Sequence, residues 1–122
     1  MSKVSIIMNC HNGEKYMREA IDSIYNQSYS DWDIIFWDNC STDETGRIAK
    51  SYDKKLKYFR SDSKTTLGKA RRLALEKNTS DFVCFLDYDD LYLPYKIEKQ
   101  LKLMENTNFA LCCGRDMLIN DE

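Results

Sequence analysis

The chain has 122 residues and a formal net charge of −2 at pH 7. A chain of this length forms one domain at most and buries roughly two-thirds of its unfolded surface, enough for a hydrophobic core. The near-neutral charge, with Lys and Arg spread along the sequence, excludes an electrostatic nucleic-acid binder, and no apolar run approaches the roughly 20 residues of a membrane-spanning helix.

Strand-type and helix-type patterns alternate along the chain. In order, we predict a strand at 4–8, a helix at 16–25, a strand at 34–37, a helix from 41 to 52, a strand at 56–59, a helix at 68–77, a strand at 82–86, a helix from 94 to 104 and a strand at 109–113. The second helix start rests on the capping-box sequence Ser41-Thr42-Asp43-Glu44, and Pro94 suits the first turn of the last helix. The pattern predicts a three-layer α/β fold with a mostly parallel sheet and helices on both faces.

The five cysteines show no CxxC spacing, and Cys84 lies within an apolar run. An odd number of thiols without metal-binding spacing is typical of reduced cytosolic cysteines. Residues 1–3 lead directly into the first predicted strand, which leaves no room for a targeting segment. We therefore expect a cytoplasmic protein, with a position at the inner face of the membrane left open.

Three carboxylates, Asp87, Asp89 and Asp90, follow the apolar run 82–86. Because this run has no polar position, we predict a strand that is buried on both faces. The acids then lie at its carboxyl end, where open α/β sheets bind ligands. Carboxylates this close repel one another unless water screens them, some cap a helix, or a divalent cation lies among them. Mg²⁺ and Mn²⁺ prefer oxygen ligands and often share them with phosphates, so the hypotheses are a metal-bridged nucleotide site and a solvated acidic turn.

Polar residues also follow the other predicted strands, where they include Asn9, Cys10, His11, Asn12, Asp38, Asn39, Arg60, Ser61 and Asp62. Asn, Asp and Ser are ordinary turn and cap residues, but their convergence at four strand ends favours a ligand site. Asp38 and Asn39 are candidates to pair with the edge of a nucleobase. His11 either stacks on a base or is merely exposed. Arg71 and Arg72 either form a solvated helix face or reach a phosphate or base carbonyl.

Taken together, these segments resemble the family 2 glycosyltransferases with a GT-A fold. The similarity runs in order through residues 4–8, 12–16, 20–24, 27–29, 37–43, 70–71 and 85–90. The resemblance implies inverting transfer of a sugar from a nucleotide-diphosphate sugar, with a UDP-sugar favoured, to the hydroxyl of a glycan or lipid-linked acceptor. It also implies a role in the synthesis of cell-surface polysaccharide or glycoconjugate.

The resemblance also assigns roles to individual residues. Asp87 and Asp89 match the family's DXD motif, which implies that Asp89 ligates an Mn²⁺ or Mg²⁺ ion bridging the donor diphosphate. Asp87 would lie near the ribose and the same ion. The positions that surround the nucleobase in the family are matched here by Asn9, His11, Asp38, Asn39 and Arg71.

The chain departs from the family pattern in two respects. Asn9-Cys10-His11 stands where Pro-Thr-Tyr or Thr-Ser-Tyr is common, and Asp38-Asn39 stands where Asp-Asp is common, so guanosine and thymidine remain open as bases. Family members are also longer. We therefore expect residues 1–122 to be the donor-binding part of a truncated GT-A domain, with the acceptor part absent and the general base beyond Glu122.

Three other classes of protein were considered. A receiver domain needs an acidic pair after the first strand, and a nucleotidyltransferase needs a Gly-rich loop with a basic residue there; the sequence has neither. A non-catalytic nucleotide-binding or regulatory module of the same fold remains the alternative to an enzyme.

Overall fold

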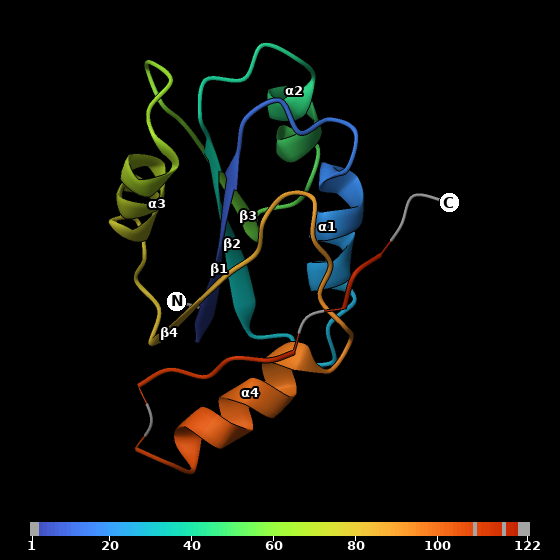
Figure 1. The fold of residues 1–122 in the computed structure, drawn as a ribbon, viewed down its shortest axis with the longest axis vertical. Helices are drawn as coiled ribbons and strands as arrows, with labels where there is room; N and C mark the ends of the chain where they lie inside the picture. Colours follow the sequence, from blue (N-terminus) through green and yellow to red (C-terminus); the bar gives the residue numbers. More distant parts are fainter. Residues whose placement is uncertain (1–2, 109, 116, 120–122) are drawn as a thin grey trace.

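The computed structural model describes residues 3–108, 110–115 and 117–119. The chain forms strands and helices in strict alternation, as predicted (Figure 1): β1 (Val4–Cys10), α1 (Met17–Tyr25), β2 (Trp32–Asp38), α2 (Thr45–Lys50), β3 (Leu56–Arg60), α3 (Leu67–Leu75), β4 (Phe82–Phe85) and α4 (Lys96–Glu105). Among these helices of the described residues, none has the length and apolar character needed to cross a membrane.

The strands form one sheet in the order β3-β2-β1-β4, and all neighbouring strands are parallel. The two central strands, β1 and β2, are buried along almost their whole length, because each is flanked by a strand on both sides and by helices on both faces. The parallel sheet that the sequence predicts is therefore confirmed.

Alternate residues of the central strands face two different helical layers. Ile6 and Ile34 belong to a core that they share with α1, α2 and α4 side chains, among them Met17, Ile21, Ile24, Ile48, Ala49, Ile97 and Leu101. Ile7 and Ile35 point the other way and pack with Ala70 and Ala74 of α3. Figure 1 shows α3 on one side of the sheet and α1 and α2 on the other. The predicted three-layer arrangement is confirmed.

The burial predicted for the apolar run 82–86 is wrong for residues 82–85 and holds only for Leu86. Phe82, Val83 and Cys84 are only half-buried, and Phe85 is 49% exposed. β4 is at the edge of the described sheet and pairs only with β1, while α3 packs mainly against β1 and β2. An apolar run shows that a strand avoids water, but the neighbours that cover it are determined by distant parts of the fold.

The strand predicted at 109–113 is not formed in the described residues. Residues 110–113 have no regular secondary structure, and residue 109 lies outside the described residues. Ala110, Leu111 and Cys112 instead line a groove together with apolar side chains of β4 and α4. An apolar segment becomes a strand only when its backbone pairs with a neighbouring strand, and here its side chains meet β4 without such pairing.

The start predicted for the second helix is also wrong. The N-cap of α2 is Glu44, and no side chain accepts a hydrogen bond in the capping-box manner. The Ser41 hydroxyl, which the capping box would use, accepts a hydrogen bond from the main-chain N–H of Asn12 instead (2.9 Å). The Ser41 hydroxyl is therefore used in a contact between two loops, the Oδ1 of Asp43 accepts the main-chain N–H of Thr45 (3.0 Å) at the start of the helix, and the helix begins later than predicted.

Candidate functional site

The carboxyl ends of the four strands lie along one edge of the sheet. The register pairs Cys10 with Asp38 and Asp38 with Arg60, so the ends of β1, β2 and β3 are level. On the other side of β1, Ile7 pairs with Phe85, which places Asp87 and Asp89 just beyond the same edge. The parallel sheet therefore gathers at one edge all the strand-end residues that the sequence singled out: Asn9, His11, Asp38, Asn39, Asp87 and Asp89.

Asp38 is a fully buried carboxylate that the protein itself surrounds with donors. Its Oδ1 accepts a hydrogen bond from the main-chain N–H of Ser41 (2.8 Å). Its Oδ2 accepts one from the hydroxyl of Tyr58 (2.5 Å) and one from Nη1 of Arg60 (3.1 Å). Burial, and then the bond to Asp38, raise the pKa of Tyr58 to about 12, so its hydroxyl stays a donor at neutral pH. Paired in this way, a buried charge is tolerated.

Asn39 is nearly buried, and its amide is used within the protein. Its Nδ2 donates to the carbonyl of Thr65 (2.8 Å), and its Oδ1 accepts from the main-chain N–H of Thr65 (2.9 Å). A longer bond joins Oδ1 to the hydroxyl of Ser61 (3.3 Å). The amide thus ties the segment after β3 to the end of β2, and these bonds fix the direction of the amide, which the sequence could not.

His11 leans against the Asn39 main chain. Its Nδ1 lies 2.8 Å from the carbonyl oxygen of Asn39. Because a carbonyl oxygen only accepts, Nδ1 carries the proton in this arrangement, and in the neutral ring Nε2 is left as an acceptor. Nε2 lies 3.4 Å from Nδ2 of Asn12. The half-buried ring is therefore held in one orientation at the sheet edge, as a stacking surface requires.

The loops after β1 and β2 are joined by several hydrogen bonds. Asn12 adopts the left-handed conformation (φ 52°), and its Oδ1 accepts the main-chain N–H of Thr42 (2.8 Å). Next to it, the N–H of Gly13 donates to the hydroxyl of Thr45 (2.9 Å), and the N–H of Glu14 donates to the carboxylate of Asp43 (3.2 Å). The segments that carry His11 and Asn39 therefore form one cross-linked unit.

Tyr88, which the sequence analysis did not single out, packs against this unit. A Cβ atom on Gly13 would lie 2.7 Å from Cδ2 of Tyr88 and 2.4 Å from Sγ of Cys10. Only glycine leaves room for the Tyr88 ring to close on the loop after β1. Burial raises the pKa of the Cys10 thiol to about 12, so it is a neutral packing group. Gly13 and Tyr88 are far apart in sequence, so no local pattern signals this contact.

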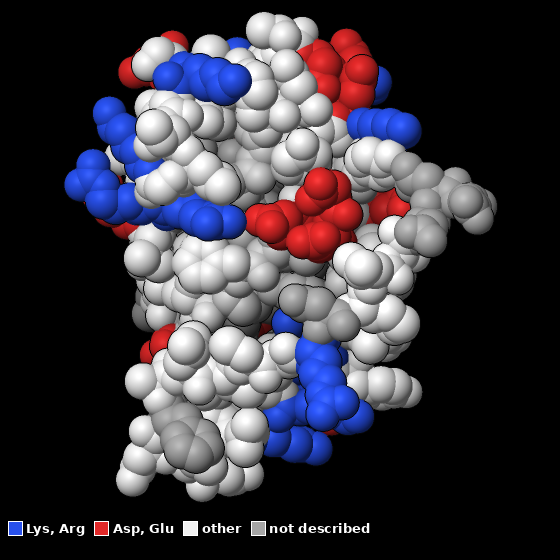
Figure 2. Space-filling model, in the orientation of Figure 1, with Lys and Arg blue, Asp and Glu red and all other residues white. Residues whose placement is uncertain are grey.

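The acidic turn after β4 is far more open. Asp87, Asp89 and Asp90 are exposed, and the main-chain N–H of Asp90 donates to the carbonyl of Asp87 (3.0 Å). Nη2 of Arg71, from α3, lies 3.4 Å from Oδ1 of Asp87. In the view of Figure 2, acidic side chains gather in the middle of the molecular surface, directly beside basic side chains on the side where α3 lies. Helix α3 therefore brings a cation to the turn.

A divalent cation fits this turn only with help from another molecule. Within the part of the chain that the structure describes, no group of three or more His, Cys, Asp or Glu side chains is arranged to hold a metal ion. Asp87 and Asp89 do offer exposed carboxylates, the hard oxygen ligands that Mg²⁺ and Mn²⁺ prefer. Magnesium typically binds through one or two carboxylates and completes its shell with water and substrate phosphates. The residues present fit that pattern.

Two buried polar atoms near the edge have no hydrogen-bond partner within the described residues. They are Oδ1 of Asn9 and Nε1 of Trp37. Asn9 and Trp37 are register partners on β1 and β2, on the α3 face of the sheet. Unpaired buried polar groups are rare in folded proteins, so this donor and acceptor mark a place where water or a ligand would add hydrogen bonds.

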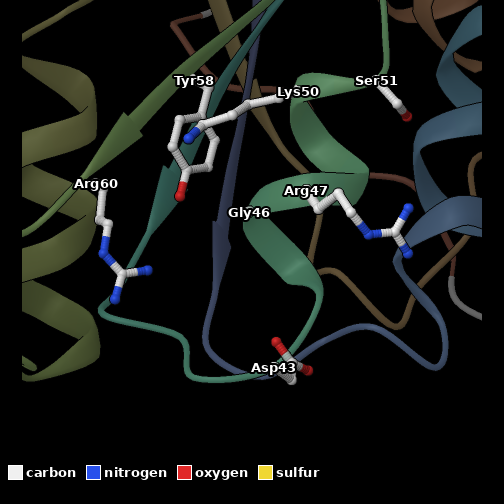
Figure 3. Close-up of a pocket in the computed structure, with 7 residues that line it drawn as sticks. All are labelled: Asp43, Gly46, Arg47, Lys50, Ser51, Tyr58 and Arg60. Atoms are coloured by element: carbon white, nitrogen blue, oxygen red, sulfur yellow. The ribbon is translucent and has the colours of Figure 1, made fainter.

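A cavity of about 560 Å³ lies between α2 and β3, next to the side chains that donate to Asp38 (Figure 3). Arg47 and Lys50 line it from α2, and Tyr58 and Arg60 line it from β3. The cations are already compensated: Arg47 pairs with Glu44, Arg60 pairs with Asp38, and the Lys50 ammonium lies 4.9 Å from the centre of the Tyr58 ring. The cavity therefore gives solvent access to Tyr58 and Arg60, the two side chains that donate to Asp38, while Asp38 itself stays fully buried.

The chain belongs to glycosyl transferase family 2, whose pattern it matches over residues 5–122. EpsE of Bacillus subtilis (strain 168) is 36% identical over an alignment of 124 positions, which covers 98% of this chain and 45% of EpsE. The Escherichia coli protein WfgD, named UDP-Glc:alpha-D-GlcNAc-diphosphoundecaprenol beta-1,3-glucosyltransferase, is 30% identical over 97% of this chain and 47% of its own length. The chain spans less than half the length of these relatives.

Solved structures agree with this assignment. The structure of residues 1–349 of S. aureus TarS in complex with UDP-GlcNAc superposes with a TM-score of 0.81 and 29% identity, over 85% of this chain and 31% of TarS 1–349. The mannosyltransferase PcManGT from Pyrobaculum calidifontis, in complex with GDP-Man and Mn²⁺, has a TM-score of 0.66 and 25% identity, over 75% of this chain and 28% of its own. The predicted GT-A fold is thereby confirmed.

Proposed function

We propose that this chain forms the donor-binding part of a metal-dependent, inverting glycosyltransferase. The observation that carries the proposal is the convergence, at one edge of a family 2 sheet, of a hydrogen-bonded polar cluster around Asp38 and an exposed acidic turn at Asp87 and Asp89. The first suits a nucleobase and the second suits a metal-bound diphosphate.

On the acidic side, Asp89 and Asp87 would hold Mn²⁺ or Mg²⁺ together with the donor diphosphate. When bound, the ion supplies Lewis-acid stabilisation of the charge that grows on the leaving diphosphate. Asp87 would also orient the ribose, and Arg71, 3.4 Å from Asp87, would add positive charge beside the nucleotide.

On the other side, the base would stack on His11 and meet Asn9, Asp38 and Asn39. Within the described residues, Oδ1 of Asn9 is a buried acceptor without a hydrogen-bond partner. The side chains of Asp38 and Asn39 are occupied by the protein, so we assign them to shaping the pocket floor as well as to contacting the base. The complex of TarS with UDP-GlcNAc supports a UDP-sugar as the donor.

We place the acceptor-binding residues and the general base in the portion of the relatives that this chain does not cover. The name of WfgD describes transfer to a sugar on diphosphoundecaprenol. By analogy, a glycan or lipid-linked acceptor used in cell-surface polysaccharide synthesis is proposed here, with the reaction in the cytoplasm at the inner face of the membrane.

The test is calorimetric titration of UDP with Mn²⁺ present and with chelator, combined with a sugar-transfer assay on this chain and on any longer natural form. We expect metal-dependent UDP binding by the 122-residue chain without transfer, and transfer only by the longer form. Asp31→Ala, a change of an exposed aspartate before β2 at the opposite edge of the sheet, is the control. Robust turnover by the 122-residue chain would show that a base lies within it, and absence of nucleotide binding by both forms would overturn the proposal.

A further inference from the structure

The Asp38 carboxylate is held from the outer strand. Tyr58 and Arg60 are two residues apart on β3, so both side chains point to the same face, and both donate to Oδ2 of Asp38. Arg60 is also the register partner of Asp38. Figure 3 shows the Tyr58 hydroxyl and the Arg60 guanidinium directed toward the same space between β3 and α2. β3 thus contributes a two-residue support for a carboxylate that belongs to β2.

Helix α2 is shaped to permit this support. A Cβ atom on Gly46 would lie 2.9 Å from the Tyr58 hydroxyl and 3.6 Å from Oδ2 of Asp38. A contact of 2.9 Å is shorter than a van der Waals contact between carbon and oxygen, so any other residue at this position would push the hydroxyl away from Asp38. The absence of a side chain at Gly46 is therefore coupled to the bond between Tyr58 and Asp38.

The support reaches the base side of the site through a short turn. Oδ1 of Asp38 accepts the main-chain N–H of Ser41, which closes the turn 38–41. Within this turn Cys40 has a φ of 60°, a left-handed conformation that is sterically disfavoured for a residue with a Cβ atom. The carbonyl oxygen of Asn39, in the same turn, accepts a hydrogen bond from Nδ1 of His11. A shift of Asp38 would thus move the group that orients the His11 ring.

We propose that Tyr58 and Arg60 are positioning residues that set the base selectivity of the nucleotide site by fixing Asp38 and, with it, the turn 38–41. They touch no donor atom in this account and act through Asp38 and His11. The inference rests on the proposed function, because it deepens the assignment of the base-binding side of that site.

The bonds from Tyr58 and Arg60 to Asp38 would also stabilise the fold. Control variants must therefore separate an effect on stability from an effect on base selectivity, and the same sheet offers suitable residues. Lys57, also on β3, pairs with Asp33 of β2 (2.9 Å), and Asp33 is buried like Asp38. This second pair lies toward the amino-terminal end of β2, away from the candidate site. Tyr52 offers a matched tyrosine, since its hydroxyl donates to the carboxylate of Asp22 (2.8 Å) on α1.

The experiment compares Tyr58→Phe and Arg60→Met with the controls Tyr52→Phe and Lys57→Met, all in the full-length protein. Dissociation constants are measured with Mn²⁺ for UDP, CDP, GDP and pyrophosphate. We expect Tyr58→Phe to weaken the preferred nucleotide by roughly fivefold, the value of one hydrogen bond, and to reduce its preference over the other bases. Pyrophosphate, which lacks a base, should bind within about twofold of wild type. The controls should keep wild-type selectivity, and Gly46→Ala should reproduce the effect of Tyr58→Phe.

Three results would overturn the inference. Unchanged base selectivity in Tyr58→Phe and Arg60→Met, in a wild-type protein that binds nucleotide, would show that the pair has no positioning role while leaving the proposed function intact. Equal losses for every ligand, pyrophosphate included, in Arg60→Met and Lys57→Met would show that both pairs act only on stability. Failure of the wild-type protein to bind any nucleotide would overturn the proposed function and the inference together.

Discussion

Two aspartate groups occupy the same edge of the sheet in opposite environments. Asp38 is fully buried and its carboxylate accepts three hydrogen bonds from protein donors. Asp87 and Asp89 are exposed, and within the described residues the Asp87 carboxylate makes one long contact, to Arg71. Arg60 and Arg71, the arginines that face the two groups, are almost equally exposed (44% and 45%). The difference therefore lies in the carboxylates and not in their cations.

The two sides of the candidate site therefore differ in how far the protein itself organises them. A buried carboxylate must be paired in the folded protein, so the base side is already organised before any ligand arrives. Exposed carboxylates are screened by water and keep their oxygen atoms available to a cation. Under the proposed function, the base side of the candidate site would be preformed, and the diphosphate side would be completed by the metal and the nucleotide.

The largest effect on nucleotide binding is expected from the exposed aspartates, Asp87 and Asp89. Asp89→Ala should reduce Mn²⁺-dependent UDP affinity on the order of 100-fold, or about 2.7 kcal/mol, because it removes a carboxylate ligand of the ion. Calorimetry with and without chelator measures this. Asp31→Ala should bind like the wild type. Equal UDP affinity of Asp89→Ala and wild type in Mn²⁺ would remove Asp89 from the metal site.

Replacing each arginine in turn tests the contrast in burial. Arg60→Met leaves the buried Asp38 without its cation and should lower Tm by roughly 5–10 °C. Arg71 pairs with Asp87, a carboxylate that is 57% exposed and screened by water. Arg71→Met should therefore lower Tm by about 2 °C or less. Thermal unfolding followed by circular dichroism compares the two variants. Equal shifts would mean that the burial of Asp38 does not determine the strength of its ion pair.

The stacking role of His11 predicts a smaller effect on binding. His11→Ala should weaken UDP by about fivefold, which corresponds to about 1 kcal/mol for an aromatic contact. Pyrophosphate affinity, measured in the same titrations, should be unchanged because pyrophosphate has no base to stack. If UDP affinity is also unchanged, His11 is only a loop residue without a role in stacking.

The smallest effect concerns the turn beside Asp38. Cys40→Gly should raise the free energy of unfolding by about 1 kcal/mol or less, because glycine adopts φ 60° without the steric penalty of a Cβ atom. Asn12→Gly, at a φ of 52°, is the counterpart, and it should not stabilise because it loses the bond from Thr42. Urea denaturation measures the free energy of unfolding of both variants. Stabilisation by both would show that the Asn12 side chain contributes nothing to stability.

Local patterns were sufficient to predict most of the fold. The alternation of apolar strands and amphipathic helices predicted the parallel sheet, and Ala20, Ile21 and Ile24 form the buried face of α1 as expected. Because every strand runs the same way, residues that follow the strands had to meet at one edge. That topological consequence, and not any single motif, made the location of the site predictable.

Predictions that depended on distant partners were less successful. The burial of β4 depends on which elements flank it, and the hydroxyl of Ser41 is used by Asn12, almost thirty residues away, in place of a helix cap. The support of Asp38 by Tyr58 and Arg60 was missed, although their spacing of two residues at the end of a predicted strand was a usable signal. The direction of the Asn39 amide required the bonds to Thr65.

The most direct test of the account is hydrogen–deuterium exchange of the chain with UDP and Mn²⁺. We predict slower exchange in three separated segments, residues 10–14, 39–42 and 87–90, and loss of the protection at 87–90 when chelator removes the metal. Segments at the opposite edge of the sheet, residues 30–32 and 53–55, should exchange as in the free protein. Protection confined to those opposite-edge segments, or protection at 87–90 that survives the chelator, would contradict a metal-bridged nucleotide site at the carboxyl edge.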